Sequence, residues 1–149
     1  MAQFRITKFN PANRLPDGTF KEWTSFSQVG SSVTLEKYEE VELNYIDSVI
    51  QIFTHNKFKS FKIAGLENRL GECQYQNGND VDLINLKKVI KAILRDEYCC
   101  RLENNRSFIH FGPDYHMYVC APEIPEFIKK KIGKRSLFVE PFKSPIPVR

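Results

Sequence analysis

Three short runs of strand-forming residues that lie close together constrain the fold of this chain more than any other feature. Aromatic and other apolar side chains recur in these runs, which are Tyr98–Glu103, Ser107–Phe111 and Tyr115–Cys120. Asn104-Asn105 separates the first two runs, and Gly112-Pro113-Asp114 separates the last two. Connections of two or three residues require that neighbouring strands run antiparallel. The segment therefore predicts an antiparallel β-meander.

Two longer segments predict the principal helices. Thr34 is a good N-cap, and apolar side chains then recur at helical spacing as far as residues 55–56. In residues 83–94, Leu, Val and Ile form an unbroken apolar stripe, and Asp80 or Asp82 is the expected N-cap.

The remaining segments complete an alternation of strands and helices. A long loop with scattered aromatic residues fills positions 10–32. A short helix is expected at Glu123–Ile132, and further strands at Gln3–Phe9, Ser60–Leu66 and Ser136–Phe142. This order predicts an α+β fold, in which two principal helices pack on one face of a mixed or mainly antiparallel sheet. The length of 149 residues, with no visible linker or repeat, predicts a single domain over residues 1–149.

Composition excludes several broad classes of protein. Hydrophobic residues make up 42% and charged residues 27% of the chain, as in an ordinary globular protein. No apolar run approaches the roughly 20 residues that cross a bilayer, and the start Met-Ala-Gln-Phe-Arg has no apolar signal region. A cytoplasmic protein without membrane contact is therefore expected. The four cysteines, two of them adjacent, suit neither a zinc knuckle nor a disulfide framework and are expected as free thiols.

The motifs of the common nucleotide-binding, serine hydrolase and zinc protease classes do not occur, namely G-x-G-x-x-G, G-x-x-x-x-G-K-[ST], G-x-S-x-G and H-E-x-x-H. The irregular spacing of cysteine and histidine also argues against a metal site. We therefore expect no catalysis, no cofactor and no metal. One catalytic alternative stays open: His110 and His116 can form an acid and base pair, which with a basic neighbour cleaves RNA through its own 2′-hydroxyl. A histidine in an aromatic hairpin is also a common half-buried structural residue.

Aromatic and basic residues fit a nucleic-acid-binding module as well. The aromatics expected on adjacent strands, where bases can stack, are Phe108, Phe111, Tyr115 and Tyr118. Residues 123–149 hold seven basic and three acidic side chains and carry the whole net charge of +4. The same aromatics fit a sheet face under the two helices, and a run of lysines is commonly a solvated helix face. An RNA-binding or RNA-cleaving role of the hairpin at residues 106–118 is therefore the alternative function.

The main interpretation is a protein that binds another protein. One side of the first helix is acidic, and tryptophan and tyrosine in the long loop and the hairpin are the residue types that most often anchor interfaces. The candidate partner-binding residues are Glu36, Glu39, Glu40, Asp47, Trp23, Tyr115 and Tyr118.

Three short segments resemble a pattern in small bacterial proteins: residues 22–30 (E-W-T-S-F-S-Q-V-G), 35–38 (L-E-K-Y) and 110–118 (H-F-G-x-D-Y-x-M-Y). Some proteins of this size and make-up are immunity proteins of toxin and immunity pairs. The resemblance implies a non-catalytic inhibitor that binds and neutralises one cognate toxin domain, with charge complementarity speeding association. Inhibitors of basic nucleases tend to be acidic, whereas this chain is net positive. Either the acidic helix alone makes the contact, or the toxin is not a basic nuclease.

Overall fold

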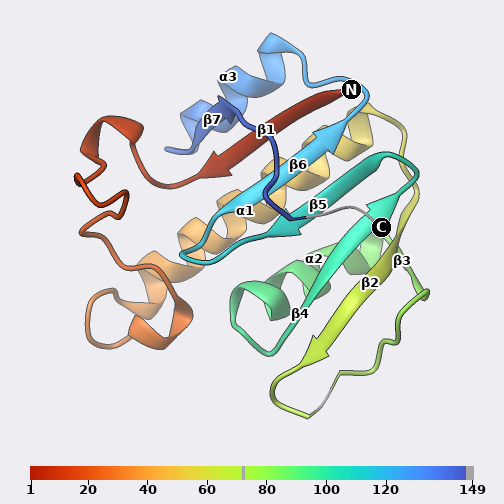
Figure 1. The fold of residues 1–149 in the computed structure, drawn as a ribbon, viewed down its shortest axis with the longest axis horizontal. Coiled ribbons are helices and arrows are strands. Elements are labelled where there is room, and N and C mark those ends of the chain that lie inside the picture. Colours follow the sequence, from red (N-terminus) through yellow and green to blue (C-terminus); the bar gives the residue numbers. More distant parts are fainter. Residues whose placement is uncertain (72, 147–149) are drawn as a thin grey trace.

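The computed structural model describes residues 1–71 and 73–146 of the chain. Within these ranges it contains three α-helices and one seven-stranded antiparallel sheet with the order β3-β2-β4-β5-β6-β1-β7 (Figure 1). The helices are α1 (Leu35–His55), α2 (Leu83–Leu94) and α3 (Glu126–Lys134). The strands are β1 (Ala2–Thr7), β2 (Ser60–Asn68), β3 (Asp80–Asp82), β4 (Tyr98–Asn104), β5 (Ser107–Phe111), β6 (Met117–Ala121) and β7 (Phe138–Pro141).

The predicted α+β class and the antiparallel meander are confirmed. Strands β4, β5 and β6 are neighbours in the chain and in the sheet, and Ile109 pairs with Leu102 on one side and with Val119 on the other. Helices α1 and α2 lie on the same face of the sheet, behind it in Figure 1, where α1 contacts β6 and α2 contacts β4. Helix α3 lies beside β7 at the other end of the sheet from β3.

Capping side chains set the start of both principal helices. The Thr34 hydroxyl accepts a hydrogen bond from the Lys37 amide at 3.2 Å, as predicted. At α2, a carboxylate oxygen of Asp82 accepts one from the Asn85 amide at 2.8 Å, so that Asp82 is the N-cap. Asp80 belongs to the edge strand β3, which the sequence did not predict because three residues give no periodic signal.

Five of the six predicted strands have bounds that differ by one or two residues in the structure, and two of these differences have a clear local cause. Strand β6 begins at Met117 because Asp114 and Tyr115 both have positive φ, 59° and 64°, and belong to the turn. Strand β2 continues to Asn68 through a bulge that follows Ala64.

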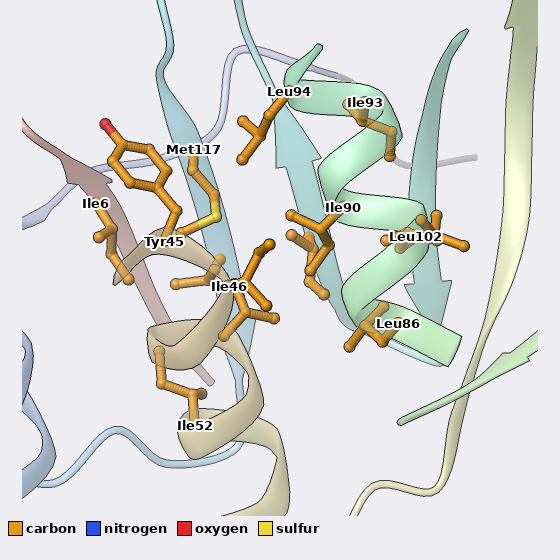
Figure 2. Close-up of a cluster of buried hydrophobic side chains, with 14 of the residues drawn as sticks. Ile6, Tyr45, Ile46, Ile52, Leu86, Ile90, Ile93, Leu94, Leu102 and Met117 are labelled. Carbon is orange, nitrogen blue, oxygen red and sulfur yellow. The ribbon is translucent and has the colours of Figure 1, made fainter. Parts of the chain in front are cut away.

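The main core lies between the sheet and the two principal helices, and its side chains are almost wholly buried. Figure 2 shows Ile46 of α1 and Ile90 of α2 between the helices, with Leu102 and Met117 reaching toward them from the strands. Burying one such side chain contributes roughly 1.5–3 kcal/mol to folding. This packing fixes the rotation of α1, so that its polar side faces outward.

The opposite face of the sheet, here named the outer face, is crossed by the end of the described chain. Residues 142–146, here named the C-terminal strap, leave β7 and run over β1 and β6 toward β5 (Figure 1). Strand alternation places Arg5, His110 and Tyr118 on this face. The outer face is therefore a second, smaller layer of packing.

The remaining predictions concern the membrane, the cysteines and the basic segment. No described helix combines the length and the apolar character needed to cross a membrane. The free cysteines are Cys73, Cys99, Cys100 and Cys120. The lysines of the basic segment belong mainly to α3, and Arg149 lies outside the described residues.

Candidate functional site

The outward side of α1 arranges predicted carboxylates in a straight line. Glu36, Glu40, Leu43 and Asp47 follow one another at intervals of four, three and four residues, which places them on one line along a helix. This line, here named the acidic stripe, spans about 16 Å at 1.5 Å per residue. Glu36 and Glu40 are exposed, Asp47 is half-buried, and the Leu43 side chain in their midst is 41% exposed.

Leu43 was not predicted as a functional residue. The sequence contains a signal for it, since it is an apolar residue in phase with the acidic residues and out of phase with the buried stripe. An exposed leucine alone is unremarkable, but one framed by carboxylates gives the stripe an apolar centre.

The carboxylates of α1 differ in how they are paired. Glu40 lies 3.4 Å from the Lys37 amino group at the surface, and Glu39 lies 3.4 Å from Arg95. No ion pair involves Glu36 or Asp47 within residues 1–71 and 73–146. The stripe therefore keeps most of its negative charge available to solvent or to a partner.

Arg95 is the residue that holds the adjacent carboxylates in place. Its Nε and Nη2 atoms donate hydrogen bonds to both carboxylate oxygens of Glu42 at 2.8 and 3.0 Å. These bonds raise the pKa of Arg95. The Glu42 side chain is 5% exposed, so it belongs to the interior and not to the acidic stripe.

Tyr115 and Trp23, two of the predicted interface anchors, form an aromatic cluster. Their ring centroids lie 5.1 Å apart in an edge-to-face contact, and Trp23 is 5.3 Å from Tyr38. The Tyr115 hydroxyl donates to the Tyr38 hydroxyl at 2.9 Å, and its backbone carbonyl accepts from the Tyr45 hydroxyl at 2.9 Å. Burial raises the pKa of Tyr115. Tyr115 is a core residue, which corrects its prediction as a partner-binding residue, while Trp23 is half-buried.

The side chain of Lys8 holds the Trp23 ring against the end of β1. No sequence pattern had indicated this role of Lys8. The Lys8 amino group lies 4.0 Å from the centre of the Phe9 ring and 4.1 Å from that of Trp23, with Glu22 at 3.6 Å. Burial lowers the pKa of Lys8 to about 8. This contact joins the long loop to the end of β1, so Trp23 serves the fold first.

Tyr118 is also withdrawn from the exposed surface. It lies on the outer face, 6% exposed, and its ring centroid is 5.7 Å from that of Phe142 in the C-terminal strap. The prediction of Tyr118 as a partner contact is therefore corrected for this conformation, because the strap covers it.

The two histidines of the hairpin occupy different surroundings. His110 is fully buried on the outer face, where its Nδ1 atom is 3.1 Å from the Ser144 hydroxyl and its Nε2 atom is 3.5 Å from Glu103. Burial lowers the pKa of His110 to about 4, so the ring is neutral at pH 7.

The ring of His116 stacks on Phe9 at 5.5 Å, and its Nδ1 atom donates to the Pro113 carbonyl at 2.9 Å. Burial also lowers the pKa of His116. In the described part of the chain, no hydrogen bond or ring contact joins His110 to His116. The geometry therefore does not bring them together as an acid and base pair.

The described residues contain no group of three His, Cys, Asp or Glu side chains with the spacing of a metal site. No family model, curated protein or solved structure matches the chain. The acidic stripe, with its exposed leucine and partly unpaired carboxylates, is the candidate functional site.

Proposed function

We propose that the chain is a non-catalytic protein-binding module of the inhibitor or immunity type, which holds a protein partner against the acidic stripe of α1. The observation that carries the proposal is the alignment of Glu36, Glu40 and Asp47 around the exposed Leu43. Interfaces commonly combine an apolar anchor with a charged rim that excludes water and sets orientation.

The chemistry of the stripe points to a partner with a basic surface. Local charge governs such a contact, because screening at physiological salt limits interactions between exposed charges to about 8 Å. The net charge of +4 resides in residues 123–149, part of which packs on α1, where Arg135 Nη1 lies 3.4 Å from the Ser48 hydroxyl. A toxin domain with a basic face around an apolar pocket fits this surface, and steering by opposite charge speeds association.

The surroundings of His110 favour this proposal over RNA cleavage. A general acid or base must reach a proton of the substrate, and His110 is buried beneath the C-terminal strap. Its lowered pKa also keeps it unprotonated at neutral pH, so it cannot donate the proton of a general acid. Phe108 and Tyr118, the aromatics nearest to it on this face, are buried as well.

The test begins with capture of the tagged full chain from its native host and quantitative identification of co-purifying proteins. We expect one partner at a near-stoichiometric amount, and we expect the double variant Glu36→Lys/Glu40→Lys to lose it. Reversal of two charges at the rim is expected to weaken the complex by a factor of about 10–100. Leu43→Ala is expected to weaken it about tenfold, because it removes the apolar anchor and leaves the charge unchanged.

The matched control is Glu67→Lys/Glu97→Lys, which makes the same change of charge at exposed positions outside α1. This control is expected to keep the partner. If the partner is a toxin, co-expression with the wild-type chain restores growth and co-expression with Glu36→Lys/Glu40→Lys does not. Retention of the partner by the α1 variant, or recovery of RNA in place of a protein, would overturn the proposal.

A further inference from the structure

A segment of the chain itself, the C-terminal strap, lies across the outer face of the sheet and contacts its side chains. In the C-terminal strap, Phe142, Ser144 and Ile146 contact the sheet, with Ser144 and Ile146 half-buried and Phe142 37% exposed, while Lys143 and Pro145 between them are exposed. Every second side chain of the strap therefore meets the sheet, and the backbone bends at Pro145 and Ile146.

The first contact holds an aromatic ring. The guanidinium of Arg5 lies 4.1 Å from the centre of the Phe142 ring, and the Tyr118 ring is 5.7 Å away on the neighbouring strand. The Phe142 amide donates to the Gln3 carbonyl at 3.3 Å. Arg5 is itself oriented by Glu140, 3.2 Å away on the other side.

The second and third contacts hold a hydroxyl and an aliphatic side chain. The Ser144 amide donates to the Gln3 side-chain oxygen at 2.9 Å, and the Ser144 hydroxyl is 3.1 Å from His110 Nδ1. Ile146 packs on a small cluster of Phe108, Tyr118 and Cys120, which is separate from the main core. The outer face thus contains three distinct subsites within five residues of an extended chain.

Three buried polar atoms of this face make no hydrogen bond within residues 1–71 and 73–146, namely Arg5 Nε, Arg101 Nη2 and His110 Nε2. Arg5 and Arg101 are paired through their other nitrogens with Glu140 and Glu103, and His110 Nε2 lies 3.5 Å from Glu103. A buried N–H without an acceptor destabilises the state that covers it. A peptide with further acceptors can satisfy the two arginine atoms, so the strap is a replaceable occupant.

We propose that the outer face binds an extended peptide segment of a protein partner in place of the C-terminal strap. The segment has an aromatic residue, a hydroxyl residue and an aliphatic residue at alternate positions. Main-chain and alternate side-chain contacts of this kind are a general mode of peptide recognition. The charges of the face favour a peptide over a nucleic acid, because Arg5 is paired with Glu140 and Arg101 is paired with Glu103. This surface is independent of the acidic stripe and does not rest on the function proposed for it.

The experiment uses the full chain and a fluorescent peptide, Glu-Pro-Phe-Lys-Ser-Pro-Ile, with the sequence of residues 140–146. The double variant Phe142→Ala/Ile146→Ala weakens the strap and leaves the side chains of the outer face unchanged. We expect it to bind the peptide at least about tenfold more tightly than the wild type, in which the strap competes from the same chain. A peptide with alanine in place of phenylalanine is expected to lose this binding.

The matched control is Leu70→Ala/Phe127→Ala, which truncates two exposed apolar side chains elsewhere and is expected to bind the peptide no better than the wild type. Circular dichroism and thermal melting check that each variant folds. If the strap variant does not fold, Ser144→Ala is the second variant, and we expect it to gain affinity several-fold. A folded strap variant without the gain, or one that prefers labelled oligouridine to the peptide, would overturn the proposal.

Discussion

Replacing Arg95 with methionine leaves the Glu42 carboxylate buried without its partner. Arg95 supplies hydrogen bonds of 2.8 and 3.0 Å to Glu42, and its guanidinium lies 4.8 Å from the centre of the Phe26 ring. Methionine keeps part of the apolar contact with this ring but donates no hydrogen bond. The substitution therefore isolates the cost of an unpaired buried carboxylate.

Removal of one partner from a buried ion pair typically costs about 3–5 kcal/mol. The Arg95 side chain is 18% exposed, so water reaches the pair and the lower end of this range applies. We expect the free energy of unfolding of Arg95→Met to fall by about 3 kcal/mol. For a chain of this size, the melting temperature is expected to fall by roughly 6–12 °C.

Urea unfolding followed by tryptophan fluorescence measures this loss, because Trp23 is the single tryptophan and packs against Tyr38 and Tyr115. The double variant Arg95→Met/Glu42→Gln removes the unpaired charge and is expected to recover about 2 kcal/mol.

Glu39→Gln is the control, because it removes an exposed contact of Arg95 at 3.4 Å and is expected to change stability by less than about 0.5 kcal/mol. A loss below about 1 kcal/mol in Arg95→Met would refute the reasoning. So would a double variant as unstable as Arg95→Met alone.

Two further predictions concern the outer face. His110 has a pKa of about 4 in the folded chain against 6.5 for an ordinary histidine. The unfolded state therefore binds more protons between these values, and up to about 3 kcal/mol of stability is lost as the pH falls from 6.5 toward 4. His110→Gln is expected to flatten this part of the pH profile of urea unfolding; equal slopes in the wild type and the variant would contradict the assignment. Gly65 has a φ of 61°, and a Cβ there would lie 2.5 Å from Arg101 Nη1, so Gly65→Ala is expected to cost about 1–2 kcal/mol in the same assay. Gly133→Ala, where a Cβ meets nothing within 4 Å, is expected to be neutral or stabilising, and equal losses at both glycines would refute the steric argument.

Elements with a strong local signal could be predicted from the sequence. The apolar stripe of α2 and the cap at Thr34 act within one or two turns, so the pattern alone locates both principal helices. The meander follows from its short turns. Strand β3 escaped prediction because its pairing with β2 is a tertiary contact across an irregular loop.

The residues of the candidate site show the same difference between local sequence signals and contacts with distant segments. The carboxylates of the acidic stripe could be placed on one side of a helix from their spacing, and the exposure of Leu43 follows from that phase. The burial of Tyr115 and Tyr118 could not be predicted from the sequence. It depends on the loop around Trp23 and on the C-terminal strap, which are more than twenty residues away. The amino-acid composition of a hairpin is the same whether its aromatic side chains face solvent or a distant segment of the chain.

The place of β1 in the sheet has a consequence for folding during synthesis. Ile6 pairs with Met117 on one side and with Val139 on the other, so β1 has no strand partner until most of the chain has been made. At about 5–20 residues per second, a ribosome needs roughly 7–26 seconds to extend the chain from β1 to β7. Strands β2 and β4, with α2 between them, are made together and can associate first. The half of the sheet that contains β6, β1 and β7 therefore forms late, although β1 is made first. Pairings between strands so far apart in the chain are intrinsically slow.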